Sequence, residues 1–141
     1  MLDPAASSHA LLHASASAQA RAVAAGQVCA ASLLQLQLDA VRHRNPQLNA
    51  FIAQPPTPAL EPGTSTLAGS SFAAKDNFDV AGLPTASGLR AVSRIATRDA
   101  PLVARLRGAG LACLGKLNMH PMALGATNHN PDYGDCFNPR R

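Results

Sequence analysis

The sequence has no tryptophan, few other aromatic residues and little charge. It contains four phenylalanines and one tyrosine, and charged residues make up 14% of its 141 positions, well below the roughly 25% of ordinary domains. Hydrophobic residues reach 47%. A chain so poor in charge buries much of its surface, either in itself or against further sequence. We take this composition as favouring a fragment of a larger protein.

Clustered positive charge is also missing, although the formal net charge is +4. A basic balance can indicate nucleic acid or an anionic surface, but such sites gather their basic residues, often between aromatics. Here the arginines are spread along the chain, a distribution that is typical of side chains on a solvated surface. We therefore predict no direct nucleic-acid partner. The internal arginines are Arg21, Arg42, Arg44, Arg90, Arg94, Arg98, Arg105 and Arg107.

The chain has no uninterrupted apolar run of about 18 residues, so nothing in it is expected to span a membrane. Its three cysteines, Cys29, Cys113 and Cys136, are odd in number and widely spaced. This pattern provides no disulfide framework and fits a reducing cytosol. The first residues lack the basic region of a signal peptide and include Asp3. We expect a cytoplasmic protein.

Metal and phosphate motifs are absent as well. His120, His129 and Cys136 follow no usual zinc spacing. The glycines of Gly108-Ala109-Gly110 are expected to end a helix, whereas a phosphate-binding loop would open one. The sequence therefore predicts neither a metal site nor an organic cofactor.

The composition divides the chain into three segments. Residues 1–25 are an Ala/Ser-rich leader, for which a frayed helix and disorder both remain open. Residues 26–66 hold an amphipathic helix and a proline-rich linker. That helix is expected to be capped by Ser32 and to end at Asn45-Pro46. Its buried stripe is predicted to be Leu34, Leu38 and Val41.

Residues 67–141 have the pattern of an α/β protein. Ser71–Lys75 reads as a short buried strand before the turn-prone Asp76-Asn77. Asp99 is expected to cap a helix that buries Leu102, Val103 and Leu106, with Gly110 at the C′ position just beyond its end. Residues 111–114 read as a second buried strand, which Gly115 ends. Strand, crossover helix and strand together predict two parallel strands.

Several short phrases follow one another along this last segment. Lys75-Asp76-Asn77 comes first, and the run VAGLPT at residues 80–85 follows. Farther along are RLRGAG at residues 105–110, GKLNM at residues 115–119 and Asn138-Pro139. In their order and spacing these phrases resemble the first half of an amidase-signature hydrolase. Four positions before Lys75 depart from the family's usual pattern: Ser65, Thr66, Ser70 and Ser71.

The resemblance implies a fold and an activity. The fold would be the N-terminal portion of a mixed β-sheet flanked by helices, and we expect it to be incomplete in these residues. The activity would be hydrolysis of the carbon–nitrogen bond of a small amide, without metal or cofactor. The family uses two serines and a lysine, in which one serine attacks the carbonyl and the other relays its proton to the lysine.

Lys75 falls on the family's lysine. A lysine acts as a base only when it is neutral, and burial beside apolar groups favours the neutral form. Phe72-Ala73-Ala74 would supply such surroundings. Ala123 and Gly125 fall on a wall of the family's substrate pocket, although plain packing of a helix against a loop explains them equally well. Lys116 is expected to be a structural or exposed lysine in a turn.

The family's Gly/Ser-rich nucleophile segment is not found between Lys75 and Arg141. We therefore expect these residues to have no chemistry of their own. Two alternatives to a free-standing amidase stay open. One is the glutaminase subunit of a tRNA-dependent amidotransferase, which has the same landmarks, and the other is a truncated, non-catalytic remnant.

Overall fold

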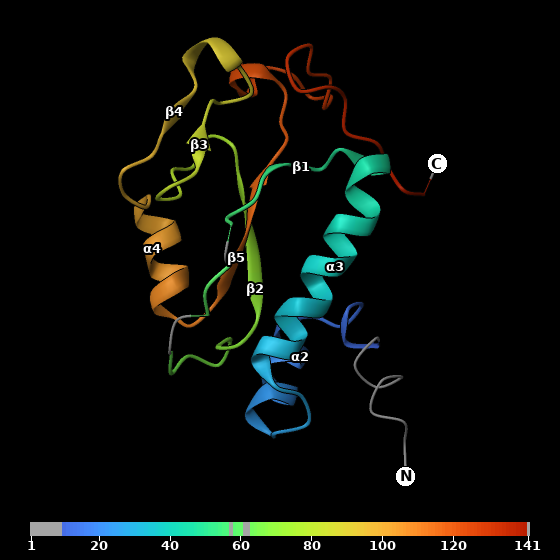
Figure 1. Ribbon diagram of the computed structural model, residues 1–141, viewed down its shortest axis with the longest axis vertical. Coiled ribbons are helices and arrows are strands. Elements are labelled where there is room, and N and C mark those ends of the chain that lie inside the picture. The colour runs from blue at the N-terminus through green and yellow to red at the C-terminus, as the bar shows by residue number, and fades with distance from the viewer. Residues whose placement is uncertain (1–9, 57, 61–62, 141) are drawn as a thin grey trace.

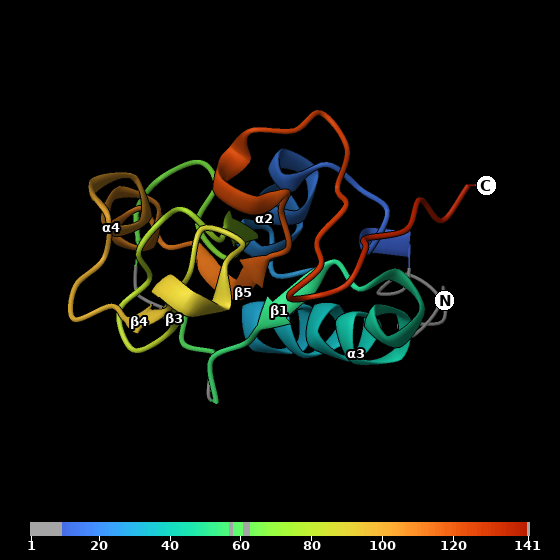
Figure 2. The same ribbon diagram turned by 90° about the horizontal axis from the view of Figure 1, so that it is seen from above.

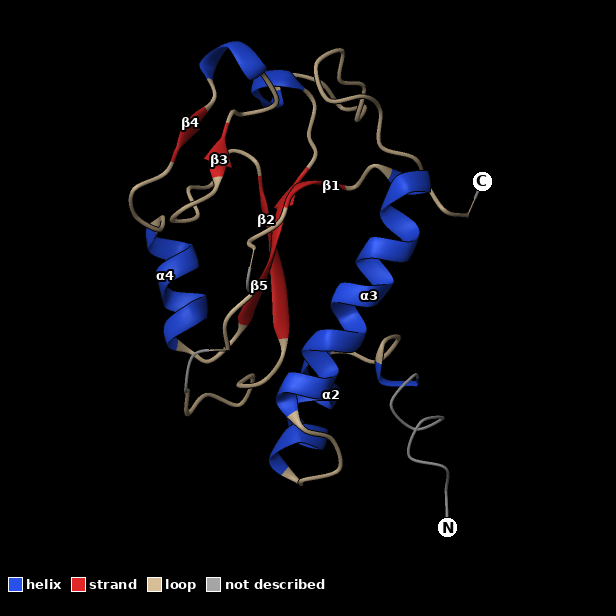
Figure 3. Ribbon diagram, in the orientation of Figure 1, coloured by secondary structure: helices blue, strands red, loops and turns tan. Residues whose placement is uncertain are grey.

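The computed structural model describes residues 10–56, 58–60 and 63–140, as a mixed α/β arrangement (Figures 1 and 3). A three-stranded sheet stands between helices, and the connecting loops gather at its two ends. The main elements, in chain order, are α2 (Ala16–Ala24), α3 (Ala30–Leu48), β1 (Phe51–Ala53), β2 (Ser71–Lys75), β3 (Pro84–Thr85), η1 (Arg90–Val92), β4 (Arg94–Ile95), α4 (Pro101–Gly108), β5 (Ala112–Leu117) and η2 (Pro121–Ala123).

The sheet has the order β1-β5-β2. β5 runs parallel to β2 and antiparallel to β1, so the sheet is mixed. The route from β2 to β5 passes through α4, which confirms the predicted crossover of strand, helix and strand. The separate hairpin of β3 and β4 lies along this route. The N-terminal part of the expected fold class is therefore present.

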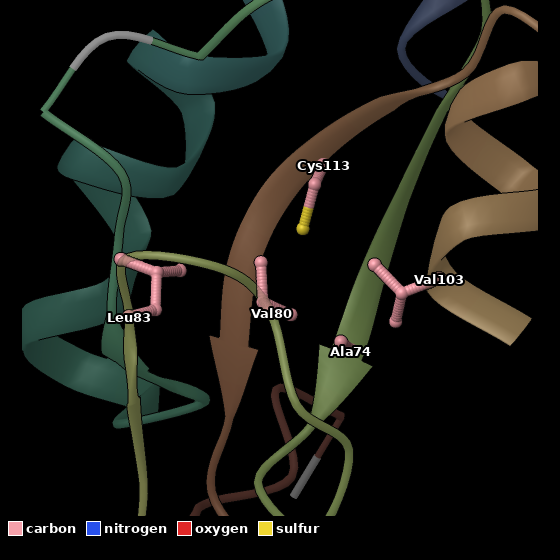
Figure 4. Close-up of a cluster of buried hydrophobic side chains, with 5 residues drawn as sticks. All are labelled: Ala74, Val80, Leu83, Val103 and Cys113. Atoms are coloured by element: carbon pink, nitrogen blue, oxygen red, sulfur yellow. The ribbon is translucent and has the colours of Figure 1, made fainter. Parts of the chain in front are cut away.

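Helices cover the sheet from opposite sides (Figure 2). On one side, Val103 of α4 packs with Ala74 of β2 and Cys113 of β5, together with Val80 and Leu83 (Figure 4). Because side chains alternate along a strand, β5 also contributes Ala112 and Leu114 to the other side of the sheet. There they form a second cluster with Leu34 and Leu38 of α3.

The alternation changes at Gly115. Cys113 pairs with Phe72 and Lys116 pairs with Ala74, so β5 uses one residue more than β2 between these two pairs. Such a bulge moves the following side chain to the other face of the sheet, and Lys116 consequently lies on the face of Cys113. Gly115 has a φ of 140°, and a β-carbon there would lie 2.3 Å from the carbonyl oxygen of Ala53. Only glycine lets β1 approach this closely.

Two predicted limits of α3 are wrong. The helix begins before Ser32, with Cys29 at its N-cap. It also continues through Pro46 to Leu48, and Asn49 then adopts a left-handed conformation. The side chain of Asn45 bonds both the N–H and the C=O of Phe51 and ties the helix end to β1. Pro46 lacks the N–H that would bond the carbonyl oxygen of Arg42, so the helix gives up one hydrogen bond two residues before its end.

The start of α4 also differs from the expectation. Its N-cap is Ala100, while the carboxylate of Asp99 accepts a hydrogen bond from the N–H of Ala81 and pairs with Arg107. Leu102, expected to be buried, is 50% exposed. Gly110 follows the helix with a φ of 87°, which confirms the predicted C-terminal stop.

The N-terminal leader contains a helix where the structure describes it. Ser15 caps α2 by accepting a hydrogen bond from the N–H of Ala18. Residues 1–9, which belong to the same predicted leader, lie outside the described residues. In the described part of the chain, none of the helices combines the length and the apolar character needed to cross a membrane.

We predict that residues 1–141, expressed alone, fold poorly. β2 is only half-buried and forms an edge of the described sheet. Large apolar side chains are exposed as well, including Ile95 at 62% and Leu124 at 86%. Unpaired edges and apolar patches favour aggregation. The polypeptide should bind the dye ANS and unfold without a sharp thermal transition. A soluble monomer that has a sharp thermal transition and does not increase the fluorescence of ANS would contradict this prediction.

A second prediction concerns the thiols, because the described structure holds all three cysteines free. Hydrogen bonds from the N–H groups of Ser32 and Ala31 lower the pKa of exposed Cys29, whereas burial raises the pKa of the Cys113 thiol. In the folded protein from the complete reading frame that contains this chain, iodoacetamide should modify Cys29 at least about tenfold faster than Cys113. Peptide mass spectrometry measures both rates. Equal rates would contradict the burial of Cys113, and a peptide that stays unlabelled after unfolding would reveal a disulfide.

Candidate active site

The polar residues of interest gather where β2 and β5 end. Lys75 is the last residue of β2, and it is paired with Leu117, the last residue of β5. The segment after each strand continues from the same edge of the sheet, near the top of Figure 1. Carboxyl ends of parallel strands are the usual place for ligand sites in α/β proteins. This edge is therefore the candidate active site.

A pocket of about 360 Å³ opens at this edge. Lys75 lines it, and so do Ala123 and Gly125, the other two residues that the sequence singles out. They come from segments nearly fifty positions apart in the chain, and the fold brings them to one concavity. The remaining lining residues are Leu117, Asn118, Met119, His120, Ala126, Thr127 and Asn128.

The side chain of Lys75 is exposed, so one expectation about its surroundings is wrong. Ala74, its neighbour, is buried in the cluster under α4, and successive side chains of a strand point to opposite faces. Lys75 therefore points away from that cluster and toward the pocket. The described residues do not bury it, although they do place it beside a cavity.

Lys116 is the buried lysine of this structure, contrary to the expectation of a turn. It lies inside β5 because the strand runs through Gly115 to Leu117. Its side chain has no exposed surface, and its Nζ atom lies 3.1 Å from Oδ1 of Asp76. The ammonium also donates to the carbonyl oxygen of Pro84 at 2.8 Å and to Oγ1 of Thr85 at 2.9 Å. These three partners satisfy its donors.

Two buried asparagines hold the loops that follow β5. Nδ2 of Asn118 donates to the carbonyl oxygens of Asn49 and Gly134. Nδ2 of Asn130 donates to those of Met119 and Gly88 at 2.8 and 3.1 Å. Hydrogen bonds from side-chain amides thus join segments whose irregular backbones do not pair as strands. Nothing in the local sequence around Asn130 distinguishes it from an ordinary turn residue.

The pocket wall after β5 is tightly folded. Met122 and Ala123 both have positive φ angles, 53° and 58°, which side chains other than glycine rarely adopt. The N–H of Met122 is held by the carbonyl oxygen of Ser87 at 2.8 Å. A β-carbon added to Gly125 would lie 2.3 Å from the ring of His120. Glycine at this position keeps the ring and the loop in contact.

Two aspartates near this edge have a lowered pKa. A hydrogen bond from Arg94 lowers the pKa of Asp79, and the N–H of Asn130, followed by His129, lowers that of Asp135. A carboxylate whose pKa falls on folding stabilises the protein at pH values above its unfolded pKa, and this contribution is lost as the pH drops through its folded pKa.

Among the residues that the structure describes, no three His, Cys, Asp or Glu side chains lie close enough to hold a metal ion.

The comparison with known proteins agrees with the arrangement of these elements. The Amidase family model matches residues 31–141. The chain is 36% identical over 141 aligned positions to a subunit of the glutamyl-tRNA(Gln) amidotransferase of Azoarcus sp. (strain BH72), covering 92% of this chain and 29% of that protein. It is 37% identical over 127 positions to the indoleacetamide hydrolase of Pseudomonas syringae pv. syringae, covering 84% of this chain and 28% of that protein.

Solved structures share the fold over most of these residues. The 6-aminohexanoate cyclic dimer hydrolase superposes with a TM-score of 0.79 at 26% identity, over 92% of this chain and 28% of its own. The peptide amidase of Stenotrophomonas maltophilia superposes with a TM-score of 0.71 at 25% identity, over 86% and 29%. The chain thus spans less than a third of the length of each of these relatives.

Proposed function

The chain belongs to the amidase signature family, and from this premise we propose that its protein hydrolyses the carbon–nitrogen bond of small amides, with Lys75 as the base. The observation that carries the proposal is the common pocket of Lys75, Ala123 and Gly125. The family resemblance selects these three residues from the sequence, and the fold independently gathers them at the carboxyl ends of the parallel strands.

The reaction needs a nucleophile besides the lysine. On this proposal a serine attacks the amide carbonyl, and a second serine, across a cis peptide bond, passes the proton to Lys75. The protonated lysine then returns a proton to the departing amine, and water cleaves the resulting ester. Both serines and the N–H groups of an oxyanion hole would come from residues outside 1–141, where the family carries its Gly/Ser-rich segment. No metal or cofactor takes part in these steps.

Those outside residues would also change the surroundings of Lys75. The lysine is exposed when only residues 1–141 surround it. A neutral amine requires removal of water, and a covering layer of protein above the pocket would provide this. The small side chain of Ala123 and the bare backbone of Gly125 leave room for a substrate acyl group close to the lysine.

A second candidate is the glutaminase subunit of a tRNA-dependent amidotransferase. The 36% identity to an amidotransferase subunit over 92% of this chain favours it. The chemistry at Lys75 would be the same, but the ammonia released from glutamine would pass to a partner subunit instead of to solvent. Both candidates are cytoplasmic enzymes with no direct nucleic-acid contact through these residues.

The assay that separates the two candidates measures ammonia release from a panel of amides by the protein from the complete reading frame. Glutamine, indoleacetamide, simple carboxamides and a peptide amide form a suitable panel. A free-standing amidase turns over at least one of them without any partner. A glutaminase subunit prefers glutamine and gains activity when the other components of the amidotransferase are added.

Lys75→Met should lower kcat by about 10²–10⁴-fold, because it removes the proton acceptor and keeps a side chain of similar length. The Tm should stay within a few degrees, because covering an apolar methionine costs less than covering the amine that it replaces. Arg98→Ala, which removes another exposed cation in the loop before α4, is the control and should keep the unaltered kcat. A Lys75→Met protein with near-normal kcat would show that the base lies elsewhere.

Gly125→Ala should raise the KM for amides several-fold with a smaller effect on kcat. The added methyl group would meet the His120 ring at 2.3 Å and push the wall into the pocket. Gly108→Ala is the matched control, because a β-carbon at Gly108 meets no atom within 4 Å. Steady-state kinetics of both variants check this prediction. Equal KM values for the two variants would contradict the proposal that Gly125 borders the substrate.

A further inference from the structure

The buried ion pair of Lys116 and Asp76 goes beyond the roles assigned above. We propose that this pair is a positioning device for Lys75, which holds the end of β2 and the turn at residues 84–88 in the one arrangement that directs Lys75 into the pocket. The inference rests on the proposed function, because it concerns the geometry of the same base. Lys116 and Asp76 would be positioning residues, without contact to the substrate.

Asp76 is the residue next to Lys75, and every polar group it has is engaged. Its N–H donates to the carbonyl oxygen of Leu117 at 3.1 Å, and its own carbonyl oxygen lies 3.4 Å from the N–H of Ser87. Oδ2 accepts hydrogen bonds from the N–H groups of Ala86 and Gly88 at 3.3 and 2.9 Å. Oδ1 faces the Lys116 ammonium. One side chain thus joins β2, β5 and the 84–88 turn.

Lys116 completes this arrangement from the neighbouring strand. Besides Asp76, its ammonium binds the carbonyl oxygen of Pro84 and the hydroxyl of Thr85, at the start of the same turn. Asp76 therefore holds the turn by its end, and Lys116 holds it by its beginning. The turn also holds the pocket wall, because the carbonyl oxygen of Ser87 accepts the N–H of Met122.

Stability alone is a poor reason for this pair. Lys116 has no exposed surface and Asp76 is 1% exposed. Desolvating two charges costs about as much as their attraction returns, and well-packed apolar residues serve a core at least as well. What the pair adds is a fixed arrangement, because separating two buried charges leaves each of them uncompensated and is strongly destabilising. The residue so fixed is the one that follows the base.

The test compares three variants of the protein from the complete reading frame. Lys116→Met leaves the Asp76 carboxylate buried without its cation, so the Tm should fall by many degrees. In the combined variant Lys116→Met/Asp76→Asn both charges are gone, and the asparagine oxygen can still accept from Ala86 and Gly88. This variant should regain most of the lost Tm. Thr85→Val removes one hydrogen bond from Lys116 without unpairing a charge and should fold normally.

Positioning and stability predict different results for the combined variant. If the pair positions Lys75, kcat stays at least about tenfold low with KM within about twofold, although the Tm has recovered. Thr85→Val should show the same split to a smaller degree. Arg94→Gln, which breaks the half-exposed pair of Arg94 with Asp79 nearby, is the control and should keep kcat. Recovery of kcat together with the Tm would overturn the proposal.

A readout that needs no turnover keeps the two hypotheses apart. An amine-selective reagent labels Lys75 at a rate that depends on the accessibility and surroundings of its amine. Peptide mass spectrometry measures this rate. The combined variant should label Lys75 at a rate changed by at least about threefold from the unaltered protein, while the Tm is retained. If the unaltered protein hydrolyses no amide, the proposed function fails, and this labelling rate still decides the role of the pair. An unchanged rate would overturn the positioning role.

Discussion

The ammonium group of Lys116 sets the strongest constraint on this structure. A charge with no exposed surface must find its partners inside the protein. It finds them in Asp76, Pro84 and Thr85, which belong to the segment that follows β2. The strand end, the turn after it and the central strand are therefore locked to one another. Lys75 and Leu117, the chain neighbours of Asp76 and Lys116, line the pocket on the opposite face of the sheet.

The sequence predicts the outline of this fold well where several signals agree. The strand Ser71–Lys75 is found at its predicted limits, although it is half-buried and not buried, because an apolar run stands between a glycine turn and a turn-prone Asp-Asn pair. The parallel pairing with β5 follows from the crossover helix between the two strands. The predicted role of Gly110 just beyond the end of α4 is also confirmed, since this glycine takes a positive φ angle.

The errors arise where one residue has two possible roles. The sequence predicts that Gly115 ends a strand, but this glycine serves as a bulge that admits the backbone of β1. That single difference places Lys116 inside the strand instead of in a turn, and so creates the buried ion pair. Asp99 is predicted at a helix cap, but its carboxylate bonds Ala81, a residue eighteen positions earlier. Long-range partners of this kind leave no periodic trace in the sequence.

The candidate site shows the same division. A family resemblance selects Lys75, Ala123 and Gly125, and their common pocket appears only in three dimensions. The burial expected for Lys75 is wrong, because alternation along β2 turns its side chain away from the core under α4. The roles of Asn118 and Asn130 could not be predicted, since their hydrogen bonds join segments that are distant in the chain.

We propose that a serine outside residues 1–141 attacks the amide while Lys75 takes up its proton. Mass spectrometry of the protein from the complete reading frame, quenched during turnover of an activated ester of a substrate acid, tests this directly. The account predicts an adduct with the mass of the acyl group on a serine beyond residue 141, and its loss in the Lys75→Met variant. An acyl group on any residue within 1–141 would contradict this proposal. So would turnover that produces no adduct and continues unchanged in the Lys75→Met variant.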